Sequence, residues 1–76
     1  MNLNERHFLQ HLGFRSRERR IELKMTQADL GAKCHLHRTF IGSVERGERN
    51  IAILNLRQIA RTLRMPLAEL FRETEK

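Results

Sequence analysis

The side chains best suited to metal binding or covalent chemistry lie in the run Cys34-His35-Leu36-His37, and His7 and His11 stand four residues apart near the N-terminus. Histidine and cysteine are the usual zinc ligands, and a cysteine beside a histidine can act as a nucleophile. Cys34 is, however, the only cysteine, and no zinc-finger spacing surrounds it. A chain of 76 residues also has little material for a substrate pocket or an oxyanion hole. We therefore expect no metal, no cofactor and no enzymatic activity, and interpret Cys34 as a buried apolar residue.

Arginine supplies most of the charge of the chain. The formal net charge is +6, and twelve of the fifteen basic residues are arginine. Guanidinium groups bind phosphate and guanine in a bidentate manner, so this charge indicates a polyanionic partner such as DNA. Arg57, Arg61 and Arg64 follow one helical face and are interpreted as solvated surface. The chain has no signal peptide and no apolar run that could span a membrane, and a lone cysteine fits a reducing cytosol, so we expect a cytoplasmic protein.

Helices are expected to position these side chains, because apolar residues recur at helical spacing and no segment alternates as a strand does. Five helices are predicted: residues 4–24, from Gln27 to the turn at 34–37, about 38–46, from about 52 to just before Pro66, and about 67–72. The predicted fold is an all-α, compact five-helix domain. It should form a single domain over residues 1–76, with loose ends at residues 1–5 and 74–76.

Local signals predict where the first two helices begin. Asn4 is assigned as the cap of the first helix. Thr26 and Asp29 have the spacing of a capping box, with aspartate in place of the usual glutamate or glutamine. Gly13 weakens the first helix by about 1 kcal/mol relative to alanine, so fraying of residues 1–12 is left open.

The residues 18–30, ERRIELKMTQADL, and 41–47, IGSVERG, resemble the helix-turn-helix of lambdoid phage repressors and Cro proteins, the XRE family. The resemblance extends over about residues 12–71. More narrowly, residues 36–50, LHRTFIGSVERGERN, are similar to the controller proteins of restriction–modification systems, which are small dimeric regulators. The resemblance implies a lambda-repressor-like DNA-binding fold in which the helix beginning at Arg38 enters the major groove.

The family relation also implies roles for the residues of this motif. The base-reading positions, including an aromatic ring suited to a thymine methyl group, are Arg38, Thr39, Ser43 and Phe40. The positions that contact the DNA backbone and fix register without reading sequence are Gln27, Arg46, Arg49 and Asn50. Helical spacing places Ile41 and Val44 inward, and it places outward Arg38, Thr39, Gly42, Ser43 and Arg46.

The inner stripe of the first helix is unusual, because either a basic residue faces inward or the helix is loosely held. Helical spacing from Leu12 reaches Ser16 and then Arg19 or Arg20, so the inner stripe is interrupted by an arginine. The family pairs an inward arginine of the first helix with a glutamate near the end of the third. The resemblance therefore implies a structural ion pair between Arg20 and Glu45.

Three positions depart from the family pattern. Glycine is usual where His35 stands, an aliphatic residue is usual at Ser16, and glycine is common at Lys24. We therefore expect His35 to adopt a left-handed conformation that non-glycine residues rarely take, just before a helix cap at His37.

Apolar residues near the C-terminus exceed the obvious needs of the core. They are Leu67, Leu70 and Phe71, with part of the stretch 53–56. They either complete the core or, as the resemblance suggests, form a two-fold dimer interface. In a dimer, two reading helices would meet half-sites about one DNA turn apart.

Together these features predict a homodimeric, sequence-specific transcriptional regulator that binds a near-palindromic operator on double-stranded DNA. The narrower hypothesis is a bacterial or phage-encoded, nucleoid-associated controller that regulates its own promoter in a restriction–modification locus, with RNA polymerase as a further partner. The alternative is an antitoxin-like or other protein-interaction module that uses the same helix face. An RNA-binding function is disfavoured because no aromatic stacking platform is visible.

Overall fold

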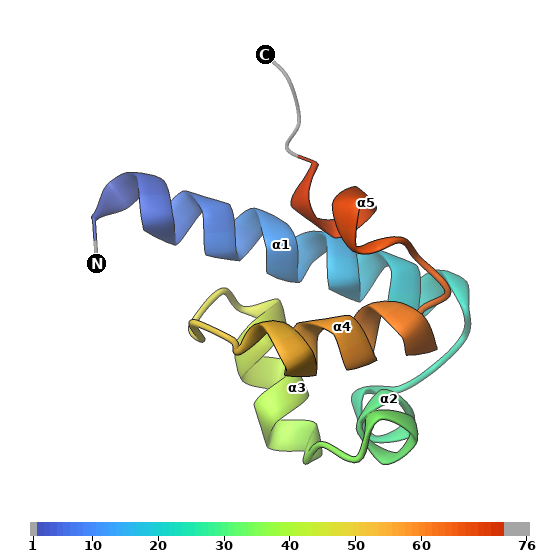
Figure 1. The fold of residues 1–76 in the computed structure, drawn as a ribbon. Helices are drawn as coiled ribbons and strands as arrows, with labels where there is room; N and C mark the ends of the chain where they lie inside the picture. Colours follow the sequence, from blue (N-terminus) through green and yellow to red (C-terminus); the bar gives the residue numbers. More distant parts are fainter. Residues whose placement is uncertain (1, 73–76) are drawn as a thin grey trace.

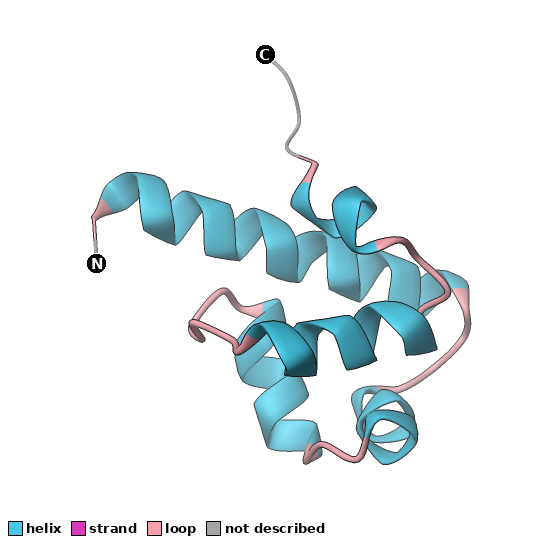
Figure 2. Ribbon diagram, in the orientation of Figure 1, coloured by secondary structure: helices cyan, strands magenta, loops and turns pink. Residues whose placement is uncertain are grey.

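The computed structural model describes residues 2–72, which form five helices and no strand (Figures 1 and 2). The helices are α1 (Leu3–Glu22), α2 (Gln27–Cys34), α3 (Arg38–Glu45), α4 (Ile53–Thr62) and α5 (Leu67–Phe71). This confirms the predicted all-α, five-helix fold. None of these helices is both long enough and apolar enough to span a membrane. The predicted loose end at residues 74–76 lies outside the described residues.

The first helix begins earlier than predicted. Asn2, rather than Asn4, is its N-cap: the Asn2 side chain accepts a hydrogen bond from the Glu5 amide (2.8 Å), and the Glu5 carboxylate accepts one from the Asn2 amide (3.2 Å). This reciprocal pair satisfies amides that would otherwise lack a partner. The prediction of a loose end at residues 1–5 is therefore wrong for residues 2–5, which are the cap and first turn of α1.

Gly13 lies at a close approach of α1 to the end of α3. A Cβ atom at this position would lie 2.3 Å from the carbonyl oxygen of Val44, and α1 continues unbroken through the glycine. The residue that weakens an isolated helix therefore permits a close helix crossing. One turn further on, Ser16 is fully buried, and its hydroxyl donates to the Leu12 carbonyl oxygen (3.0 Å). This hydrogen bond satisfies the polar group where the family usually has an aliphatic side chain.

Both ends of α2 match their predictions. Thr26 Oγ1 accepts a hydrogen bond from the Asp29 amide, and the Asp29 carboxylate accepts one from the Thr26 amide, both at 2.9 Å. The hydrogen bond from the Thr26 amide, followed by that with the Thr26 side chain, lowers the pKa of Asp29. At the C-terminal end, His35 has φ 62° and is left-handed. The Leu36 amide then donates to the Gly31 carbonyl oxygen (2.8 Å) and closes the turn.

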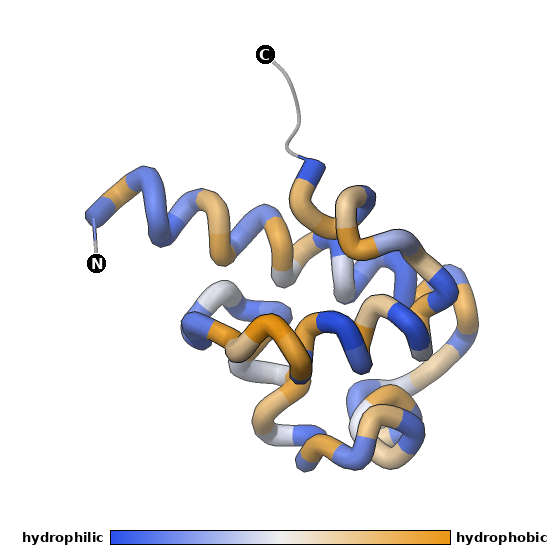
Figure 3. Tube along the Cα trace, viewed as in Figure 1, coloured by the Kyte–Doolittle hydropathy of each residue, from blue (hydrophilic) through white to orange (hydrophobic). Residues whose placement is uncertain are grey.

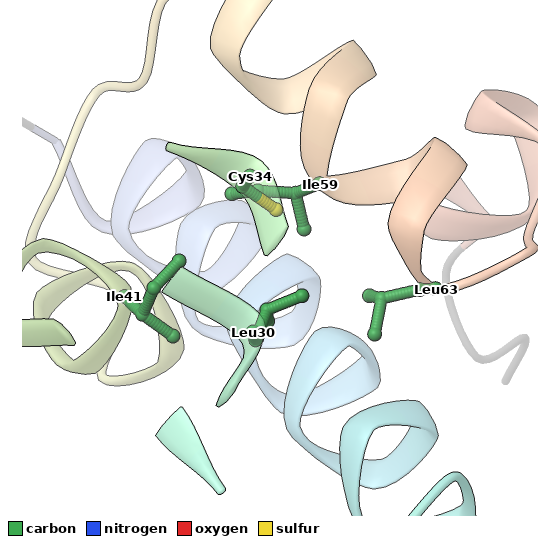
Figure 4. Close-up of a cluster of buried hydrophobic side chains, with 5 residues drawn as sticks. All are labelled: Leu30, Cys34, Ile41, Ile59 and Leu63. Carbon is green, nitrogen blue, oxygen red and sulfur yellow. The ribbon is translucent and has the colours of Figure 1, made fainter. Parts of the chain in front are cut away.

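The core consists of two clusters of buried side chains that share α4. The first cluster joins α2, α3 and α4 (Figure 4). It consists of Leu30, Cys34, Ile41, Ile59 and Leu63, the last being the C-cap residue of α4. The second joins α1, α4 and α5 through Leu12, Leu56, Ala60 and Leu70. Figure 3 shows α4 alternating between apolar and polar segments, as a helix with one buried face does.

The last helix is attached to the first. The Glu69 carboxylate lies 3.5 Å from the Arg15 guanidinium, and the rings of Phe8 and Phe71 stack with centroids 6.0 Å apart. Leu70 is 0% exposed and belongs to the second core cluster. The prediction that Leu70 contributes to a dimer interface is therefore wrong, because this side chain already packs inside its own protomer.

Candidate nucleic-acid interface

The first turn of α3 is open to solvent. His37 caps the helix through its ring: Nδ1 accepts a hydrogen bond from the Thr39 amide (3.0 Å), and the Thr39 hydroxyl also contacts this nitrogen. Arg38 and Thr39 are both exposed. Arg38 forms no ion pair with any residue of the described range 2–72. Both residues predicted to begin base reading are therefore open to solvent; the Arg38 guanidinium is free of ion pairs within residues 2–72, while the Thr39 hydroxyl is engaged with the capping histidine.

A buried ion pair ties α3 to α1. Arg20 Nε donates to Glu45 Oε2 at 2.7 Å and Arg20 Nη2 donates to Glu45 Oε1 at 3.1 Å, so the pair is bidentate. Arg20 Nη1 donates to the Met25 carbonyl oxygen at 2.8 Å. The side chains of Arg20 and Glu45 are only 10% and 3% exposed. The structure thus brings together the two residues that the resemblance pairs, and each nitrogen of the buried guanidinium has an acceptor.

Gln27, the first residue of α2, joins the same network. Its Nε2 donates to Glu45 Oε1 at 3.0 Å. Its Oε1 lies beside Gly42, where an added Cβ atom would be 3.3 Å from this oxygen and 3.2 Å from Arg46 Nη1. Gly42, which helical spacing placed on the open face, is in fact buried, and its missing side chain leaves room for Gln27 and Arg46. Gln27 therefore braces α3, and its contact with a DNA phosphate stays a prediction.

Ser43 does not lie on the open face of α3, as helical spacing predicted. It is only 9% exposed; its hydroxyl donates to the Phe40 carbonyl oxygen (2.7 Å) and accepts from Arg49 Nε (3.1 Å). The Arg49 guanidinium also lies over the half-buried Phe40 ring, 4.8 Å from its centroid. The prediction of an outward Ser43 is wrong because Arg49, in the loop after α3, covers this part of the helix.

The other candidates for backbone contacts lie around the end of α3. Gly47, with φ 74°, turns the chain against α1, where an added Cβ atom would lie 2.6 Å from Gln10 Cα. Arg46 is exposed, and its Nε donates to the Glu48 carboxylate at 3.0 Å. Asn50 is also exposed, and it shares the lining of a surface hollow with Asn4, Glu5, Phe8 and Leu9. Gln27, Arg46 and Arg49 thus adjoin α3, whereas Asn50 lies beside the first turns of α1.

A helix-turn-helix family model matches residues 17–70, from the middle of α1 to the buried Leu70 of α5. The chain belongs to the XRE-type helix-turn-helix family. Among its relatives, control protein C.MunI of Mycoplasma sp is 36% identical over 58 residues, which are 76% of this chain and 78% of that protein. Control protein C.BamHI of Bacillus amyloliquefaciens is 44% identical over 39 residues, 51% of this chain and 48% of that protein.

Solved controller structures have the same fold. The restriction–modification controller protein C.AhdI of Aeromonas hydrophila is 36% identical, with a TM-score of 0.80 over 83% of this chain and 96% of that chain. Wild-type controller protein C.Esp1396I is also 36% identical, with a TM-score of 0.75 over 84% of this chain and 83% of that chain. This XRE-family chain is therefore a DNA-binding regulator of the controller type.

The inner arginines of this controller-type chain have separate structural roles. Sequence spacing left open whether Arg19 or Arg20 faces the core, and the structure assigns Arg20 to the ion pair with Glu45. Arg19 instead reaches the C-terminal end of α4, where its Nε donates to the Leu63 carbonyl oxygen at 2.9 Å. Carbonyl groups at a helix end lack intrahelical donors, and a nearby arginine is one way to satisfy them. The sequence carried no signal for this second role, which depends on how α1 and α4 pack.

The histidines and the cysteine do not gather into a site. Within residues 2–72 no group of three or more potential metal-binding side chains occurs. The Cys34 thiol is buried in the first core cluster, donates to Thr62 Oγ1 at 3.4 Å, and has its pKa raised by burial. His11 Nε2 donates to the Arg72 carbonyl oxygen at 2.8 Å, where it helps to hold the end of α5. These residues contribute to packing and helix ends in the described part of the chain.

Proposed function

We propose that this chain acts as a homodimer that binds a near-palindromic operator with α3 in the major groove. We further propose that this operator lies at its own promoter in a restriction–modification locus. The observation that carries the proposal is the first turn of α3, where Arg38 and Thr39 are exposed on a helix braced by the buried Arg20–Glu45 pair. A free arginine at such a position can bond both acceptors of guanine.

The controller C.Esp1396I supports the choice of reading residues. Its solved forms include single substitutions at three consecutive positions: an arginine to alanine, a threonine to alanine and a tyrosine to phenylalanine. Residues 38–40 are the one place in this chain where Arg-Thr precedes an aromatic residue. We infer that these tripeptides are equivalent, and that Arg38 and Thr39 read bases here.

The positive and amide side chains around α3 are proposed to bind DNA phosphates. Gln27 stands at the start of α2 and Arg46 at the end of α3, while Arg49 and Asn50 follow in the loop. Such contacts fix the register of the protein on the duplex and make binding strongly dependent on salt. Because they carry no sequence information, their loss should weaken binding to all operators alike.

The exposed apolar side chains of α4 and α5 are proposed to form the dimer interface. Ile53 and Leu54, at the start of α4, are 56% and 70% exposed. Phe71 is 37% exposed and stacks on Phe8, which lines the hollow beside Asn50. Half-buried Leu67 belongs to the same helix as Phe71. A second copy would remove these side chains from water, and two-fold symmetry would place two α3 helices on one face of the DNA.

Selection of bound sequences from a random DNA pool tests this proposal. We expect a near-palindrome with half-sites about one turn apart and an affinity that falls steeply with salt. Arg38→Ala should cost about 1–3 kcal/mol of binding free energy and relax the preference at one base pair in each half-site. Arg57→Ala, which removes an exposed arginine of α4, is the matched control and should leave the selected sequence unchanged. Unaltered affinity and base preference in Arg38→Ala would contradict the assignment.

A protein-interaction function is the second candidate, and exposed apolar residues on α1 favour it. Phe14 and Ile21 are 51% and 49% exposed and stand seven residues apart, on one side of the helix. The partner would be RNA polymerase, recruited to the DNA-bound dimer; the antitoxin-like alternative would use the face of α3 instead. Replacing both residues by serine should change transcription without changing operator affinity if this face binds such a partner. An unchanged transcript level would reject this second function.

A further inference from the structure

Three residues from α3 and the loop after it form a small cluster that we name the Arg49 cradle: Phe40, Ser43 and Arg49. The guanidinium carbon of Arg49 lies 4.8 Å from the centroid of the Phe40 ring, and Arg49 Nε donates to Ser43 Oγ at 3.1 Å. Ser43 Oγ in turn donates to the Phe40 carbonyl oxygen at 2.7 Å. The ring face and the hydroxyl thus hold one guanidinium from two sides.

These contacts occupy the groups through which Phe40 and Ser43 would otherwise meet a base. A serine hydroxyl has one proton, and that of Ser43 goes to a backbone carbonyl while a lone pair accepts from Arg49. One face of the Phe40 ring is covered by the guanidinium. Ser43 itself is only 9% exposed. The two side chains are therefore poorly placed to read bases directly.

Arg49 keeps donors available for a ligand. Arginine has five N–H groups, and only the Nε proton of Arg49 has an acceptor within residues 2–72. Arg49 is exposed and pairs with no carboxylate of these residues, whereas Arg46 bonds Glu48 at 3.0 Å. An arginine that is already held in place loses less rotamer freedom when it binds, and its planar end matches a phosphate.

We propose that Arg49 is a pre-organised phosphate contact, and that Phe40 and Ser43 are positioning residues that act through it rather than base readers. This inference rests on the proposed DNA-binding function. It assigns specificity to Arg38 and Thr39, and it assigns to Phe40 and Ser43 the orientation of a backbone contact. Tyrosine at position 40 would offer the same ring face, while leucine would not.

A double-mutant cycle on the selected operator tests the coupling. Arg49→Ala should reduce the slope of log affinity against log salt by about 1 and weaken all operators alike. Phe40→Leu should weaken binding about two- to fivefold, the range of an exposed cation–π contact, and Phe40→Tyr should retain the wild-type affinity. In the Arg49→Ala background, Phe40→Leu and Ser43→Ala should have no further effect. Thermal midpoints serve as the folding control.

Two results would overturn the inference. If Phe40→Leu weakened binding equally with and without Arg49 and shifted the preferred base, Phe40 would itself contact DNA. If Arg49→Ala changed the preferred base, Arg49 would read a base and not a phosphate.

The cradle can also be observed without DNA. In the free protein, the NMR signal of the Arg49 Nε–H should show a ring-current shift and slow exchange with water, and both should disappear in Phe40→Leu. Their absence in the wild type would reject the cradle even if the chain bound its operator as proposed. Their presence in a chain that bound no operator would support the cradle, and would reject both the phosphate contact and the proposed function.

Discussion

Arginine side chains of the same chemistry perform different tasks in this chain according to their partners. Arg20 is buried against Glu45, while Arg19 satisfies carbonyl groups at the end of α4. Arg38 is exposed and unpaired within the described residues, and Arg49 is held against Phe40 and Ser43. A buried guanidinium fixes the angle between helices, whereas a free one can bind a ligand. The number of arginines therefore says less about DNA binding than the partner of each one does.

The buried pair should be costly to break from one side. Glu45→Ala leaves the Arg20 guanidinium buried without its counter-charge and should lower the free energy of unfolding by about 3–5 kcal/mol, measured by urea denaturation. Glu48→Ala is the control, because its exposed pair with Arg46 should contribute about 0–1 kcal/mol. Equal losses in the two variants would show that the Arg20–Glu45 pair has no special role in stability.

The capping carboxylate of α2 should make part of the stability depend on pH. Hydrogen bonds in the Thr26–Asp29 capping box lower the pKa of Asp29 in the folded state. The contribution of the ionised Asp29 carboxylate to the free energy of unfolding is therefore complete above the pKa of the unfolded state, about 3.9. It is lost as the pH falls through the lower pKa of the folded state. Asp29→Asn should lower the thermal midpoint near neutral pH, and its difference from wild type should narrow in acid. Glu18→Gln, at an exposed position of α1 without an ion pair in residues 2–72, is the control for removing a carboxylate.

At the scale of elements, the crossing of α1 and α3 positions the reading helix. This crossing depends on Gly13, on the Arg20–Glu45 pair and on Gly47, which packs against Gln10. A small change at the contact would alter how α3 is presented, even though none of these residues is proposed to touch DNA. Fold stability and operator affinity should therefore respond together to changes here.

Gly13→Ala is the sharpest test of the crossing. Alanine favours an isolated helix by about 0.5–1 kcal/mol over glycine. The added Cβ would, however, lie 2.3 Å from the Val44 carbonyl oxygen. We expect a net destabilisation of about 1–3 kcal/mol by urea denaturation, as in other overpacked sites. Glu18→Ala, on the exposed side of the same helix, should change stability by less than about 0.5 kcal/mol. A stabilised Gly13→Ala variant would mean that the helices can separate without cost.

Helix-level features were predictable where the signal is local. The Thr26–Asp29 box follows from spacing and residue type, and the left-handed His35 was implied by the family's usual glycine at this position; both occur in the structure. The Asn2–Glu5 box had the same kind of signal, which the assignment of Asn4 as the cap overlooked. The burial of Ser43 had no local sequence signal, because Arg49, which covers it, comes from outside the helix.

The inward direction of Leu70, rather than of its neighbour Phe71, also depended on packing. Leu70 and Phe71 are adjacent on a short helix, and periodicity over five residues cannot separate their directions. The position of α1 buries Leu70 and leaves Phe71 partly exposed against Phe8. The residues left for the proposed dimer interface were therefore less predictable from sequence than the residues of the core.

The whole molecule is expected to function as a pair. Leu54→Glu places a charge on the exposed apolar surface at the start of α4, and burial of an unpaired charge is unfavourable. By sedimentation velocity at micromolar concentration, the wild type should be a dimer and this variant a monomer with weakened operator binding. Ile21→Glu, on another part of the surface, is the matched control and should stay dimeric. A dimeric Leu54→Glu variant would place the interface elsewhere.

The contacts between α1 and α5 join the two ends of the described chain. Phe8 stacks on Phe71, and Arg15 pairs with Glu69, so α1 cannot complete these contacts until α5 has been synthesised. Domains generally fold as units while the ribosome is still delivering the chain. Here the second core cluster needs Leu70, so a copy interrupted before α5 would lack both that cluster and part of the proposed dimer surface. Such a copy should therefore be impaired in both folding and the proposed dimerisation, and should not bind the proposed operator as a pair.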